Sequence, residues 1–180
     1  EISLGLVGSE MCIRDSGKEG TYIEKTKYDA ADDTIVTSNA SIKFFLNNTK
    51  KVKDILAMYP TILSWNIKNK SWETDERGYL RLTFQYGKKD TYQPRSFEDA
   101  FFSENEKFIT ENTFSSLHPN SLEQFKSDKD AYELANNGVS GKSSLAIEIL
   151  LNSKKEGSCD FSNWVVPTYI KEGLLWLRKD

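Results

Sequence analysis

The chain has 180 residues and a formal net charge of −3 at pH 7. This charge excludes the strongly basic surface with which many proteins bind nucleic acid non-specifically. No segment is long and apolar enough to span a bilayer, so we expect no membrane partner. The aromatic fraction of 12% is enough for a hydrophobic core, which excludes wholesale disorder. The length fits one domain or part of one.

Residues 1–16 resemble translated sequencing adapter rather than native protein. Back-translating Leu6 to Asp15 gives the bases of a transposase-based library adapter. The alternative, a short apolar leader from Ile2 to Val7, is too brief for a signal peptide. We therefore expect the native chain to begin at Gly17, with an upstream portion missing. The adapter segment carries a net charge of −2, so about −1 of the total −3 remains.

Without that segment, Cys159 is the only cysteine left. One cysteine supports neither a disulfide framework nor a zinc cluster, which suits a reducing, cytoplasmic setting.

The first half of the native chain predicts a loop, two helices and a strand. Gly17 to Asp33 is polar and indicates a loop. Ser38 is expected to cap a helix from Asn39 to about Leu46, and a second helix runs from Lys51 to Met58, before Pro60. From Tyr79 to Tyr86 apolar and polar residues alternate, as in a strand with one buried face.

The second half predicts mostly helices. Ser96 is expected to begin one, and Asp130 to Asn137 indicates another. The segment from Phe114 to Asp130 is mostly polar and predicts a surface excursion. Further helices are expected at Ser143 to Leu151 and, after Pro167, at Tyr169 to Leu177.

The cluster from Ser96 to Asp99 allows two interpretations. Ser96 and Asp99 have the spacing of a capping box, and acids in a first turn complement the helix dipole, so the cluster is consistent with a helix start alone. Alternatively, Glu98 is a metal ligand, because carboxylates just beyond the end of a strand commonly bind ligands in open α/β sheets.

Gly141-Lys142-Ser143 resembles the end of a phosphate-binding loop. Asn136 stands where the first glycine of that motif belongs, and a helix rather than a strand is expected before it, so we predict no ATP site. Lys142 opens a helix, where a cation gains nothing from the helix dipole. That conflict favours a functional role for the lysine.

Four segments in order resemble the C-terminal Toprim region of OLD-family nucleases. They are Thr37 to Lys43, Arg95 to Phe101 after the predicted strand, Lys142 to Ala146, and Val166 to Leu177. The resemblance implies an α/β fold, with an incomplete Rossmann-like Toprim sheet, flanking helices and a helical C-terminal extension. It implies that residues 17–180 are the C-terminal part of that domain, without the N-terminal ATPase and the first Toprim motifs.

Family members couple an ABC-type ATPase to a Toprim nuclease that cleaves DNA with two divalent metal ions. The resemblance assigns Glu98 as a metal ligand and Ser96 and Lys142 as catalytic residues. Ser96 would orient Glu98 or bind a metal-bound water, and Lys142 would neutralise charge on the scissile phosphate. The family's early glutamate and Asp-x-Asp have no match, and Asp29, Asp32 and Asp33 are poor substitutes because no strand precedes them.

The expected parent is thus an ATP-dependent DNA endonuclease that uses Mg²⁺ or Mn²⁺. ATP binding and homo-oligomer formation would belong to the missing domain, and the fragment alone would be inactive. The alternative is a non-catalytic interaction or regulatory module in which the Ser96–Glu98 cluster only caps a helix. A nucleic-acid binding module without catalysis is disfavoured by the near-neutral charge.

The two interpretations differ in whether Lys142 and Glu98 converge. We expect both in one cleft, about a nucleotide apart rather than in a tight salt bridge, with Glu98 near the C-terminal end of the predicted strand. His118 is expected to be a surface residue, and Cys159 a small, semi-buried one.

Overall fold

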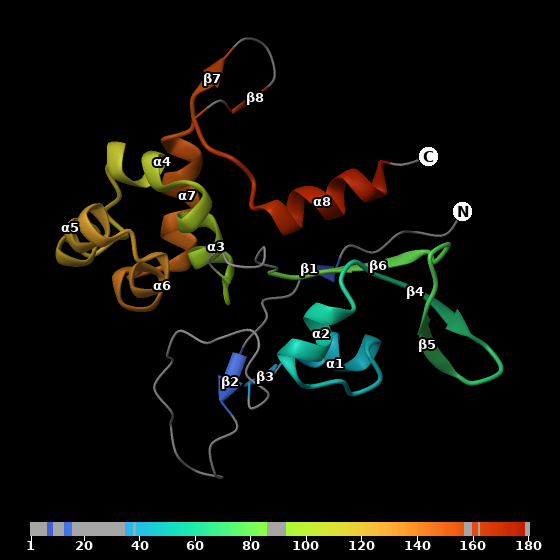
Figure 1. Ribbon diagram of the computed structural model, residues 1–180. Coiled ribbons are helices and arrows are strands. Elements are labelled where there is room, and N and C mark those ends of the chain that lie inside the picture. The colour runs from blue at the N-terminus through green and yellow to red at the C-terminus, as the bar shows by residue number, and fades with distance from the viewer. Residues whose placement is uncertain are drawn as a thin grey trace. The chain divides into compact units, whose positions relative to one another are not determined.

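The computed structural model describes residues 7–8, 13–15, 35–37, 39–85, 93–156, 160–161 and 163–178. The chain forms two compact units, Glu1–Arg95 with Thr168–Asp180 as the first and Ser96–Pro167 as the second. The sequence did not indicate this division, in which the last helix returns to the first unit (Figure 1). The predicted loop Gly17–Asp33, including its three aspartates, lies outside the described residues, as does Cys159.

The first unit contains a small sheet in the order β1-β6-β4-β5. β4 (Thr61–Asn66) pairs antiparallel with both β5 (Ser71–Thr74) and β6 (Leu80–Thr83). The two-residue β1 (Val7–Gly8) runs parallel to β6 on its other side. A separate antiparallel pair joins β2 (Ile13–Asp15) to β3 (Ile35–Thr37).

The predicted mixed α/β class is confirmed, and the strand prediction holds at Leu80–Thr83, whereas Tyr86 lies outside the described residues. β5 and β6 each run antiparallel to the central β4, and a short turn joins β4 to β5. Residues 75–79 then lead to β6 on the other side of β4, and this connection requires a glycine, since a Cβ on Gly78 would lie 2.4 Å from the Leu63 carbonyl oxygen.

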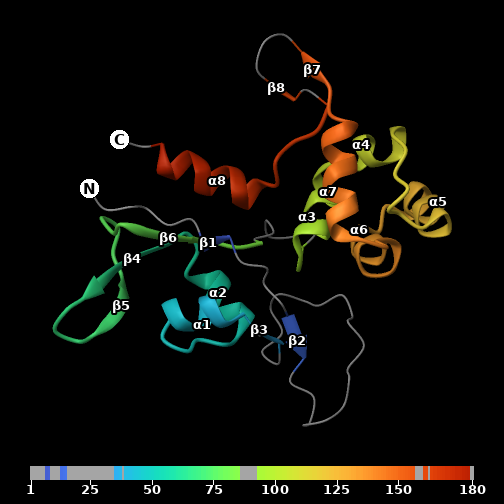
Figure 2. The same cartoon turned by 180° about the vertical axis from the view of Figure 1, so that it is seen from behind.

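Helices cover both faces of this sheet (Figures 1 and 2). Leu80, Leu82 and Phe84 point to one face, where the core forms with α1 (Ala40–Phe45) and α2 (Val52–Ala57). α8 (Thr168–Leu177) packs against β6, and its hydrogen bonds reach Arg81 of that strand and Gln85 just after it. The buried core side chains are Ile35, Ile42, Leu46, Val52, Ile55, Leu63, Leu80, Leu82 and Phe84.

Both predicted helices before Pro60 are present, with one difference at the first cap. Asn39 caps α1, and its side-chain oxygen accepts the Ile42 backbone N–H at 2.9 Å. Asn39 and Ser38 are equally good capping residue types, so the sequence alone did not decide between neighbours; Ser38 itself lies outside the described residues.

The second unit is mainly helical. Its elements are α3 (Phe97–Glu104), α4 (Glu106–Glu111), α5 (Pro119–Asp128), α6 (Ala131–Glu133), the π-helical turn η1 (Leu134–Gly138), α7 (Lys142–Leu151) and the pair β7 (Lys155–Glu156) and β8 (Asp160–Phe161). The predicted helices at Ser96, Asp130–Asn137, Ser143–Leu151 and, in the first unit, Tyr169–Leu177 are confirmed within a residue or two at their ends.

Aromatic rings fill the core of this unit. Phe101 lies at the centre with 1% of its surface exposed. Its ring contacts those of Phe97, Phe102, Phe108 and Trp164, with centroids 5.6–6.4 Å apart. This packing explains why α3, α4 and the segment before α8 converge without a sheet between them.

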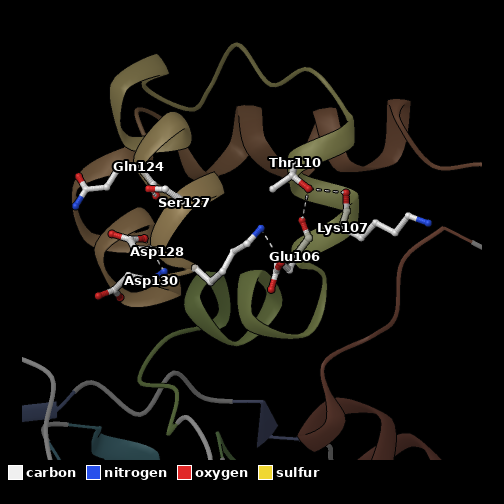
Figure 3. A network of polar contacts seen from close by, with 8 residues as sticks. Glu106, Lys107, Thr110, Gln124, Ser127, Asp128 and Asp130 are labelled. Carbon is white, nitrogen blue, oxygen red and sulfur yellow. Dashed lines mark hydrogen bonds and ion pairs between the residues drawn. The ribbon is translucent and has the colours of Figure 1, made fainter.

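The predicted surface excursion from Phe114 to Asp130 is wrong. Pro119 occupies the first turn of α5, a position that suits its fixed φ, and Phe125 of this helix is buried. Phe114 and Leu117 of the segment are buried as well, and the exposed polar residues that make up most of it hid these apolar anchors. Where α5 ends, Lys129 forms an ion pair with Glu106 of α4 at 2.7 Å, and Figure 3 shows Glu106 beside this corner.

Candidate functional site

The start of α3 is a complete capping box. Asp99 Oδ1 accepts the Ser96 backbone N–H at 2.7 Å and the Ser96 hydroxyl at 3.0 Å, while Ser96 Oγ accepts the Asp99 N–H at 3.3 Å. These bonds satisfy orphan groups at the helix start. The hydrogen bonds that Ser96 makes in this cap run to Asp99 and not to Glu98, so the orienting role assigned to Ser96 stays a prediction.

Glu98 takes no part in this cap. Its side chain is 7% exposed, and Oε1 lies 3.0 Å from Nζ of Lys142, whose side chain is 64% exposed. A buried carboxylate needs a counter-charge or several hydrogen bonds to offset its desolvation, and Lys142 supplies the charge. The structure thus brings the two predicted residues together.

The expected separation of these residues was wrong in its detail. We expected about the width of a nucleotide, and the structure shows a direct ion pair. The reason is the burial of Glu98, which the sequence-based expectation of an exposed site did not include.

Lys142 is the first residue of α7, and Gly141 before it provides no side-chain cap. η1 and the short α6 precede this segment, rather than the strand that a phosphate-binding loop requires. The ion pair with Glu98 accounts for a cation at a helix start, where the helix dipole alone disfavours it.

A second carboxylate cluster, which we call the Glu148 cluster, consists of Glu148, Ser115 and Ser116. Glu148 of α7 accepts the Ser115 and Ser116 backbone N–H groups at 3.0 and 3.1 Å. It also accepts both serine hydroxyls, that of Ser116 at 2.5 Å. The hydrogen bonds from Ser115, followed by those from Ser116, lower the pKa of Glu148 from 4.5 to about 2. No sequence pattern indicated this cluster, because its two parts are distant in the chain.

A third polar cluster, in the first unit, links α8 to the sheet. The Tyr59 hydroxyl donates to Glu172 Oε2, and Arg81 Nη2 lies 3.5 Å from the same oxygen. The Arg81 guanidinium lies over the Tyr59 ring, 6.0 Å from its centroid. Burial, and next the hydrogen bond to Glu172, raises the pKa of Tyr59 to about 12.

The remaining sequence candidates take no part in these clusters. His118 is exposed, as predicted, and precedes α5 as its N-cap residue. Glu98 belongs to the second unit and β6 to the first, so the expected closeness of Glu98 to the end of that strand stays a prediction.

The described residues do not by themselves fit a pair of divalent cations. Among them, no three or more His, Cys, Asp or Glu side chains gather as metal ligands would. Glu98 offers one carboxylate that already contacts an ammonium group, and Oδ1 of Asp99 is an acceptor within the helix cap.

Within the described part of the chain, no helix has the length and apolar character to cross a membrane. Comparisons of the chain with protein-family models, curated proteins and solved structures find no match.

Proposed function

We propose that this chain is the C-terminal part of an OLD-family, ATP- and metal-dependent DNA endonuclease, with an incomplete Rossmann-like Toprim sheet in its first unit. One support is that four segments of the chain resemble segments of that family and occur in the same order. The observation that carries the proposal is the ion pair between Glu98 and Lys142, two residues that the resemblance selects independently.

The helix-cap interpretation does not explain this pair. Ser96 and Asp99 complete the capping box without Glu98, and the helix dipole favours an acid in the first turn whether or not it is buried, so the helix start gives no reason for the burial of Glu98. A carboxylate in such a place is costly unless it is paired. Its partner comes from another helix and has a largely exposed side chain, which leaves the ammonium group accessible to an anionic ligand.

In this proposal Lys142 contacts a DNA phosphate and stabilises its charge. Glu98 pairs with the lysine while no DNA is bound, and it is one of the metal-binding carboxylates of the intact enzyme. The described residues hold too few of those carboxylates, so the intact protein must supply the others. Mg²⁺ or Mn²⁺, ATP, DNA and a second copy of the protein would be partners of that intact protein, and we expect the fragment alone to be inactive.

The second candidate is a non-catalytic interaction or regulatory module. The fully formed capping box favours it, because the Ser96–Asp99 cluster then has a sufficient structural role. The two candidates make opposite predictions for variants of Glu98 and Lys142.

The deciding experiment uses the full-length protein, expressed after its upstream reading frame has been recovered from the source DNA. Glu98→Ala and Lys142→Ala should each abolish Mg²⁺- or Mn²⁺-dependent nicking of DNA and leave ATP hydrolysis unchanged. Glu123→Ala and Lys126→Ala break a comparable but exposed ion pair on α5 and should nick at the parental rate. Nicking at the parental rate by both site variants would show that the assigned roles are wrong and favour the module.

A further inference from the structure

Three segments of the second unit are joined in a closed circuit of hydrogen bonds that begins and ends on α7. The Glu148 cluster attaches residues 115–116 to the middle of this helix. Residues 116–118 are in turn bonded to residues 138–140, which lead through Gly141 into Lys142 at the start of the same helix. We propose that Glu148 is a positioning residue that holds Lys142 against Glu98.

The second part of the circuit consists mainly of backbone bonds. The Ser116 carbonyl accepts the Ser140 backbone N–H and hydroxyl, both at 2.9 Å. The His118 N–H donates to the Gly138 carbonyl at 2.8 Å, and Leu117 and Val139 form an antiparallel bridge between these bonds. Because residues 116–118 and 138–140 are bonded at successive positions, they move together. The attachment of residues 115–116 to Glu148 therefore restrains residues 138–141, which precede Lys142.

Space is also limited where this segment begins. A Cβ on Gly138 would lie 2.6 Å from Cδ1 of Leu134 and 3.1 Å from Cβ of Ser121. Gly138, the last residue of η1, therefore lies close against Leu134 at the start of that turn and against Ser121 of α5, and its carbonyl accepts the bond from His118. The path from residue 138 to Lys142 is short, which leaves the lysine little freedom once both ends are held.

The chemistry requires a carboxylate at position 148. Its two oxygens together accept four hydrogen bonds, two from N–H groups and two from hydroxyls. An amide presents one acceptor oxygen and an NH₂ group, which would face the N–H donor of one of the serines. Glu148→Gln thus keeps the size of the side chain but replaces one accepting oxygen with an NH₂ group, which repels the donors of one serine.

Asn152, the C-cap residue of α7, provides a matched control. Its side-chain NH₂ donates to the Thr113 carbonyl and to the backbone carbonyl of Glu148, both at 3.0 Å, so it holds the other end of the same loop without contacting the Glu148 carboxylate or residues 115–118. Asn152→Ala should destabilise the loop locally but leave the path to Lys142 intact. A merely structural role for Glu148 would make the two variants equivalent.

The first test measures the coupling between Glu98 and Lys142 in the 180-residue chain. Melting temperatures of Glu98→Gln, Lys142→Met and the double variant define a cycle, which is repeated in the Glu148→Gln and Asn152→Ala backgrounds. We expect non-additive shifts in the parental and Asn152→Ala chains and additive shifts in the Glu148→Gln chain. Amide exchange at His118 and Ser140 should be at least about tenfold faster in Glu148→Gln, as local opening becomes easier.

Unchanged coupling in the Glu148→Gln background would overturn the proposal. If that variant does not fold, Ser116→Ala replaces it, since this change removes one hydroxyl donor and keeps both N–H donors to Glu148. It should reduce the non-additivity in part, and full non-additivity would count against the proposal in the same way.

The second test uses the full-length protein and rests on the proposed nuclease function. At a temperature far below unfolding, Glu148→Gln should lower kcat for nicking about tenfold, with KM for DNA and ATP hydrolysis unchanged, because a displaced Lys142 stabilises the transition state less well. Parental kcat would contradict the positioning role. If the parental protein nicks no DNA while the coupling depends on Glu148, the proposed function fails and the positioning of Lys142 stands.

Discussion

Each unit of this protein attaches a helix to its surroundings through a glutamate, but the partners differ. In the first unit, Glu172 of α8 contacts the Tyr59 hydroxyl and the Arg81 guanidinium. In the second unit, Glu148 of α7 accepts hydrogen bonds only from the N–H groups and hydroxyls of two adjacent serines. The first contact joins three side chains from three separate parts of the chain, whereas the second joins one side chain to a single short segment.

This difference determines what each contact responds to. The four donors to Glu148 come from two adjacent residues of one loop, and all of them are neutral groups. Because no counter-ion is involved, we expect this contact to be insensitive to salt. The Arg81 side chain is 13% exposed and requires Glu172 as its counter-ion, while Glu172 itself is 42% exposed and within reach of solvent ions. The α7 contact is therefore suited to fixed geometry, and the α8 contact to a response to ionic conditions.

The largest effect is expected when the Glu148 contact is broken by acid. The pKa of Glu148 is about 2 in the folded chain and near 4.5 when unfolded, so its stabilisation is fully present above pH 4.5 and is lost as the pH falls through 2. At pH 7, Glu148→Gln should be about 2 kcal/mol less stable than the parental chain. Urea unfolding between pH 2 and 7 should show this difference shrinking below pH 4.5.

Glu123→Gln is the control for that experiment, because Glu123 is an exposed glutamate with a single lysine partner on its own helix. Its effect should stay below about 0.5 kcal/mol. A difference between the parental chain and Glu148→Gln that is constant down to pH 2 would mean that the serine donors do not hold the carboxylate ionised.

The two glutamate clusters also show where prediction from sequence ends. The capping box of Ser96 and Asp99 and the helix end before Pro60 were predicted, because each depends on residues within one helical turn or on a single backbone restriction. The alternation around Leu82 likewise predicted a strand. Its antiparallel partners were not predicted, since strand order depends on which distant segments pair.

The closeness of Glu98 and Lys142, though not their direct ion pair, was expected mainly because the family resemblance selected both residues. Glu148 had no such support, and its contact with Ser115 and Ser116 depends on where α7 packs. The burial of Phe114, Leu117 and Phe125 was missed for the same reason, since a few scattered apolar residues in a polar segment form no periodic pattern.

A smaller effect is expected at Tyr59. Its pKa of about 12 lies above the usual 10, so its contribution to stability is present below pH 10 and is lost as the pH rises through 12. Tyr59→Phe should reduce stability at pH 7 by about 1 kcal/mol, because Glu172 loses a hydrogen bond and keeps Arg81. Subtracting the ultraviolet titration of the variant from that of the parental chain should isolate one phenol that ionises near pH 12. A phenol that ionises near pH 10 would contradict the contact.

The smallest effect, none within error, is expected from deleting residues 1–16. The adapter interpretation gives this segment no evolved partner, yet the structure pairs β1 with β6 and β2 with β3. These observations are compatible because the edge of the sheet at β6, and the short strand β3, offer backbone donors and acceptors to any extended peptide, whatever its sequence. The deletion should change the melting temperature by less than about 1 °C.

Val7→Pro and Ile13→Pro test the same pairs without truncation, since proline removes a backbone donor. They too should leave the melting temperature unchanged. A loss of several degrees in the deletion and in either proline variant would show that this segment is part of the fold, and the adapter interpretation would then fail as a structural claim.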